Sequence, residues 1–183
     1  MRCLTRCALL ILIAVLQAHA EQQSRYTDAM FRAAIANDST APNYVLITIR
    51  DGRNGSSRLV CVEAPFLEGA LHREHGLDYS ESGQRRARQL IVASRDRVFT
   101  FSQPAALANV APRYSPAVLA QVRSVLSSRT DAQLRSGSLD WLYASKPSDS
   151  YSAYRDAAAH VLLERGILCG RGCVVGNLYV GQR

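Results

Sequence analysis

A glutamate and two histidines in the stretch PFLEGALHREHGL have the spacing of a helical metal or acid/base site. Glu68, His72 and His75 are separated by four and three residues, so on a helix their side chains lie on one side. Zinc accepts carboxylate and imidazole ligands, and a catalytic zinc needs three protein ligands and an open water position. The simpler interpretation is that these residues lie on the solvated side of a helix, where Glu68 and His72 form a weak ion pair.

The order of these three residues argues against a metal ion. The helical signature H-E-x-x-H places its glutamate between two histidines that are four residues apart, whereas Glu68 precedes both His72 and His75. Arg73 lies beside them and would repel a cation. We therefore expect a solvated helix side without metal or cofactor. A small periplasmic hydrolase that uses Glu68, His72 and His75, with or without a metal, is the alternative.

The cysteines suggest a disulfide near the C-terminus. Cys169 and Cys173 flank the tripeptide Gly-Arg-Gly, and facing positions of a hairpin bring Cβ atoms to about 4.5–5.5 Å. We predict that they form a disulfide and that Cys61 is a buried free thiol within a strand. Pairing of Cys61 with either of them is the alternative. A catalytic Cys61 is not favoured, because no helix N-terminus or cation is placed to activate it.

The first twenty residues have the composition of a secretory signal peptide. Arg2 and Arg6 give a basic start, Ala8 to Leu16 is apolar, and Ala-His-Ala precedes Glu21. The apolar run is much shorter than the roughly 20 residues that cross a bilayer. We expect cleavage after Ala20, a secreted or periplasmic protein, and one compact domain over 21–183 with no membrane span.

Patterns along the remaining chain predict an α+β fold, with several helices packed on a small antiparallel sheet. Val45, Ile47 and Ile49 alternate in a strand that a turn-rich stretch joins to a second strand, which is typical of a hairpin. His160 lies in an apolar part of the last helix, where we expect a half-buried histidine with its hydrogen bonds made. The predicted helices are 24–36, 65–76, 82–97, 116–128, 130–142 and 148–166, and the predicted strands are 44–50, 58–63 and 98–101.

The charge of the chain favours an anionic partner. The formal net charge is +7, and Lys146 is the single lysine. A basic excess attracts lipid head groups or acidic polysaccharide, and the expected contacts are Arg85, Arg88 and Arg95 on the predicted helix 82–97, together with Arg171. Nucleic acid is not expected, because the chain carries an export signal and no aromatic residues alternate with the basic ones.

These features favour a binding protein over an enzyme. The sequence contains no G-x-S-x-G nucleophile turn, phosphate-binding loop or dinucleotide fingerprint. We expect a small exported protein that binds an envelope protein or an anionic component of the cell envelope without catalysis.

Overall fold

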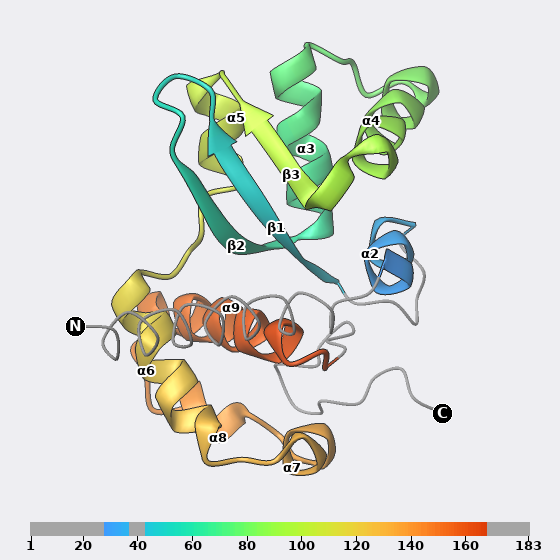
Figure 1. Ribbon diagram of the computed structural model, residues 1–183. Helices are drawn as coiled ribbons and strands as arrows, with labels where there is room; N and C mark the ends of the chain where they lie inside the picture. The colour runs from blue at the N-terminus through green and yellow to red at the C-terminus, as the bar shows by residue number, and fades with distance from the viewer. Residues whose placement is uncertain (1–27, 37–42, 168–183) are drawn as a thin grey trace, which may run out of the picture.

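A computed structural model describes residues 28–36 and 43–167 (Figure 1). The predicted signal peptide, the Cys169–Cys173 pair and Arg171 lie outside these ranges. The elements are α2 (Asp28–Ile35), β1 (Tyr44–Asp51), β2 (Ser57–Glu63), α3 (Ala64–His75), α4 (Glu81–Ala93), the 3-10 turn η1 (Arg95–Arg97), β3 (Val98–Phe101), α5 (Pro104–Asn109), α6 (Pro116–Ser127), α7 (Asp131–Ser136), α8 (Asp140–Tyr143) and α9 (Ser148–Glu164).

The fold is α+β, as predicted, but the three-stranded sheet is mixed rather than antiparallel. The strand order is β2-β1-β3. β1 and β2 form the predicted antiparallel hairpin, with Ile47 opposite Val60. β3 runs parallel to β1, with Ile49 opposite Phe99. The reason is that α3 and α4 intervene between β2 and β3, so the chain returns to the free edge of β1 in the direction of β1.

One face of the sheet is buried along its length, and the other face is covered by α9 only near the start of β1. One face carries a row of buried side chains from all three strands: Val45, Ile47, Ile49, Val60, Val62, Phe99 and Phe101. The opposite face carries Tyr44 and Cys61, which are buried under α9. Figure 1 shows α3 and α5 on one side of the sheet, with α9 passing the end at which β1 begins. Cys61 is therefore buried although it faces away from Val60 and Val62.

α3 begins and ends where the sequence predicts. Pro65 occupies its first turn, and Gly76 ends it in the left-handed conformation with φ 60°. The amide of Leu77 then donates to the carbonyl of His72 at 2.9 Å. This reversal folds the following loop back over the helix, which decides the environment of His72.

Two predicted helices end earlier than expected. α4 stops at Ala93, because the chain turns extended at Ser94 and then adopts positive φ at Asp96 and Arg97. Arg95 therefore lies beyond α4 and does not share its exposed side. The predicted helix 130–142 is divided into α7 and α8, since Gly137 has an extended conformation. Thr130 caps the N-terminus of α7.

Two glycines of the α3 region should respond oppositely to alanine. Gly76 has a positive φ that alanine disfavours by about 1–2 kcal/mol, so Gly76→Ala should lower the free energy of unfolding by that amount. Gly69 lies within α3, and an added Cβ there meets no atom within 4 Å. Gly69→Ala should raise the stability by up to about 1 kcal/mol. Urea unfolding measures both; equal effects would contradict the assigned helix end.

Candidate functional site

His72 is buried, so the prediction of a solvated helix side is wrong for this residue. Its exposed fraction is 2%. The ring of Tyr79 stacks on the imidazole with centroids 4.4 Å apart, and the Nδ1 atom lies 3.3 Å from the carbonyl oxygen of Leu77. The chain reversal at Gly76 brings both residues over His72, and helical spacing alone does not predict that.

The structure brings together two of the three predicted site residues. Glu68 Oε1 lies 4.0 Å from His72 Nε2, whereas His75 is exposed. Within 28–36 and 43–167, no group of three or more histidine, cysteine, aspartate or glutamate side chains is placed to hold a metal ion. The three predicted site residues therefore do not converge on one point.

Glu68 instead links His72 to an arginine of α4. The same carboxylate oxygen that faces His72 also lies 3.7 Å from Arg88 Nε. The His72 Nε2 atom has no hydrogen-bond partner in the described part of the chain. One carboxylate thus stands between an imidazole and a guanidinium without a close hydrogen bond to either.

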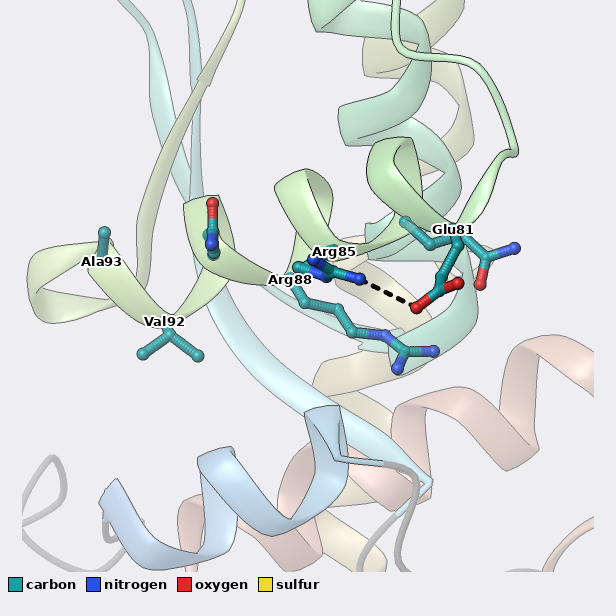
Figure 2. Close-up of a pocket in the computed structure, with 7 residues that line it drawn as sticks. Glu81, Arg85, Arg88, Val92 and Ala93 are labelled. Atoms are coloured by element: carbon teal, nitrogen blue, oxygen red, sulfur yellow. Dashed lines mark hydrogen bonds and ion pairs between the residues drawn. The ribbon is translucent and has the colours of Figure 1, made fainter.

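A groove of about 470 Å³ runs along the exposed side of α4. Figure 2 shows Arg88 and Val92 on the side of the helix that faces α2, and it marks the ion pair between Arg85 and Glu81. Two arginines and an exposed valine therefore share one concave surface. The residues that line the groove are Glu81, Gln84, Arg85, Arg88, Gln89, Val92 and Ala93.

A second hollow of about 680 Å³ continues the groove, since Val92 and Ala93 line both. Arg97 pairs there with Asp28 at 2.7 Å, and its guanidinium lies over the ring of Phe31. Arg95 lines this hollow from beyond the helix, and Arg32 lines it from α2. Arg32 and Arg97 are not among the contacts predicted from the sequence, because no local pattern connects α2 to the end of α4. The lining is Asp28, Phe31, Arg32, Val92, Ala93, Ser94, Arg95, Asp96 and Arg97.

A buried chain of hydrogen bonds joins the sheet to α9. The amide of Cys61 donates to the hydroxyl of Tyr114 at 2.8 Å, and that hydroxyl lies 2.7 Å from His160 Nδ1. His160 Nε2 contacts Glu164 at 3.2 Å, and Glu164 accepts from Arg123 at 2.8 Å. The prediction that His160 has its hydrogen bonds made is confirmed, although the residue is fully rather than half buried.

The Cys61 thiol is not activated by this chain. Burial raises its pKa well above the ordinary value, and the negative charges of Asp156, Glu63 and Glu164 raise it further. A nucleophilic cysteine needs the opposite shift and access to substrate. Cys61 is a buried free thiol, as predicted.

Two carboxylates and two arginines form a second junction beside this chain. Tyr44 donates to Asp156 at 3.1 Å, and Arg155 contacts Asp156 and Glu63 at 3.2 and 3.3 Å. Arg113 lies 3.5 and 3.6 Å from the same two carboxylates. No sequence pattern predicts this cluster, because its members are far apart along the chain.

Arg113 also explains the exposure of an aromatic residue. Phe66 is 42% exposed, whereas Leu67, Ala70 and Leu71 on the same helix are buried. The guanidinium of Arg113 lies 4.6 Å from the centre of its ring. A cation over the face of an aromatic ring is stabilising, so Phe66 is held at the surface.

The chain matches no family model, no curated protein and no solved structure.

Removing the Tyr114 hydroxyl should lower the free energy of unfolding more than removing an exposed tyrosine hydroxyl. Tyr114→Phe leaves the Cys61 amide and the His160 ring without a partner, and a buried unsatisfied group costs about 1–3 kcal/mol. Tyr154→Phe is the matched control, because its hydroxyl bonds Gln121 at the surface, and it should change stability by less than about 0.5 kcal/mol. Equal effects in urea unfolding would contradict a buried network.

Glu164 should make stability sensitive to acid. Burial raises its pKa, but the hydrogen bonds and charges of His160 and Arg123 outweigh burial, so the pKa lies below its ordinary value. A carboxyl with a lowered folded pKa stabilises above its unfolded pKa and loses that contribution as pH falls through the folded pKa. The stability difference between wild type and Glu164→Gln should therefore shrink below about pH 4.5. For the control Glu81→Gln, at an exposed carboxylate, the difference should stay near zero throughout.

Proposed function

We propose that this chain is an exported, non-enzymatic binding protein of the cell envelope, and that the groove along α4 binds the phosphate head group of an anionic lipid. The signal-peptide pattern of the first twenty residues supports export. The observation that carries the binding proposal is the set of arginines around the two adjoining hollows: Arg32, Arg85, Arg88, Arg95 and Arg97.

The guanidinium groups in the groove are accessible to a ligand. Arg85 and Arg88 are 66% and 54% exposed. The partner of Arg85 is Glu81, which is itself 90% exposed, and an ion pair between two exposed side chains is weak. Arginine matches phosphate oxygens with two parallel hydrogen bonds, so a phosphate can replace the carboxylate.

The apolar part of the groove favours a lipid over a polysaccharide. Val92 is 48% exposed between the two hollows, and Ala93 is beside it. Burying alkyl surface contributes about 25 cal/mol for each Å² removed from water. A lipid offers both a phosphate for the arginines and alkyl carbon for Val92, whereas an acidic polysaccharide offers only the charge.

The described residues offer no competing catalytic arrangement with access to solvent. His160 and Cys61 are buried in the core, and neither lines either hollow. His75 does not join Glu68 and His72. No observation favours a hydrolase as a second candidate.

Charge removal in the groove should weaken lipid binding. Each basic residue near an anionic surface contributes about 1 kcal/mol, so Arg85→Gln with Arg88→Gln should weaken binding to phosphatidylglycerol vesicles about thirtyfold. Flotation of the mature protein with these vesicles, and with neutral phosphatidylcholine vesicles, measures it.

The matched control removes the same charge from the β1–β2 hairpin. Arg53→Gln with Arg58→Gln, at two exposed arginines, should reduce binding much less. An equal loss would mean that net charge alone attracts the protein. Equal binding to neutral vesicles would contradict head-group recognition.

A further inference from the structure

His72 combines burial with an unsatisfied ring nitrogen that faces a carboxylate. A carbonyl oxygen only accepts hydrogen bonds, so the contact to Leu77 places a proton on Nδ1 of His72. In the neutral ring, Nε2 then carries a lone pair. That lone pair faces Glu68 Oε1 at 4.0 Å, and two acceptors repel each other. The arrangement explains why Nε2 has no hydrogen-bond partner among the described residues.

Protonation reverses this contact. The Nε2 atom becomes a charged donor aimed at Glu68, and a hydrogen bond to a charged partner is short, at about 2.7–2.9 Å. Glu68 Oε1 must move about 1 Å to form it. The same oxygen lies 3.7 Å from Arg88 Nε. A protonated His72 and Arg88 therefore compete for one carboxylate oxygen.

We propose that protonation of His72 draws Glu68 away from Arg88, so that this arginine is released into the groove and anions bind more tightly as pH falls. The inference rests on the proposed function and adds its regulation. Histidine is the side chain that ordinarily changes charge between pH 5 and 8.

Two neighbours of His72 favour the cation against the cost of burial. The stacked ring of Tyr79 presents its π-face to the imidazole, which favours a positive charge. Asp78 lies near enough to interact with His72, and hydrogen bonds from Ser80 hold the pKa of Asp78 below its ordinary value, so this neighbour is an anion. The titratable and charged groups on α3 and on the elements packed against it are Glu68, Arg73, Glu74 and His75 on α3, Asp78 and Tyr79 in the loop, Glu81, Arg85, Arg86 and Arg88 on α4, Arg58, Cys61 and Glu63 on β2, and Asp28 and Arg32 on α2. α5 contains no titratable side chain.

The coupling acts through the one oxygen that lies near both partners. Arg88 keeps its charge at every pH of interest, and Glu68 is the acceptor common to both partners. A neutral His72 leaves Glu68 with Arg88, and a protonated His72 competes for it. The expected change is about threefold to fivefold in affinity, the effect of one exposed ion pair.

Vesicle binding at about pH 7.5 and pH 5.5 tests the coupling, because histidine titrates between them. Wild-type protein should bind phosphatidylglycerol vesicles about threefold to fivefold more tightly at the lower pH. His72→Gln should lose this ratio, and the control His75→Gln, at the exposed histidine of the same helix, should keep it. Glu68→Gln should bind at pH 7.5 as tightly as wild type binds at pH 5.5. An unchanged ratio in His72→Gln would overturn the proposal.

A measurement on wild-type protein covers the case in which His72→Gln does not fold. The NMR signals of the Arg88 side-chain Nε–H group and the Glu68 carboxyl carbon should shift with the same midpoint as the His72 ring. Midpoints that differ would overturn the coupling. Absence of vesicle binding at both pH values would remove the proposed function, and the NMR midpoints would still decide whether His72 controls Glu68.

Discussion

The amide of Cys61 points outward from the edge strand β2 into a space closed by α9, and a buried amide must find an acceptor. Tyr114 supplies that acceptor from the segment before α6, and its hydroxyl also contacts His160 on α9. One hydroxyl group thus ties three separate parts of the chain together. Tyr44, Asp156 and Arg155 fasten the same end of the sheet to α9 a second time. The position of α9, and of α6 packed against it, depends on this polar junction as well as on apolar burial.

The parts of the fold that local patterns control are predicted from the sequence. Alternating apolar residues give the β1–β2 hairpin, and Pro65 and Gly76 give the limits of α3. Errors arise where geometry is set by distant contacts. The parallel pairing of β3 follows from the path through α3 and α4, and no residue within Val98–Phe101 encodes its direction. The short helix α5 was missed, although Glu74 accepts hydrogen bonds from the amides of Ser102 and Gln103 that precede it.

The candidate site is predicted only in part for the same reason. Helical spacing correctly places Glu68 near His72, and it places Arg85 and Arg88 on the exposed side of α4. It cannot show that the loop after Gly76 covers His72, or that α2 lies against the end of α4. These are tertiary events, so the burial of His72 and the second hollow become visible only in the folded chain.

The arginines that support the fold differ from those available to a ligand in how deeply their partner carboxylates are buried. Arg155 and Arg123 meet carboxylates that are largely buried, Asp156 and Glu164, and removing either arginine would leave a costly buried charge. Arg85 meets an exposed glutamate, so its pairing is weak and exchangeable. Arg88 is intermediate, because its partner Glu68 is partly buried and shared with His72. Net charge alone cannot separate these roles, since almost all the cations are the same residue type. The exposure of each partner carboxylate distinguishes the two roles. By this criterion, the more weakly held guanidinium groups lie along α4.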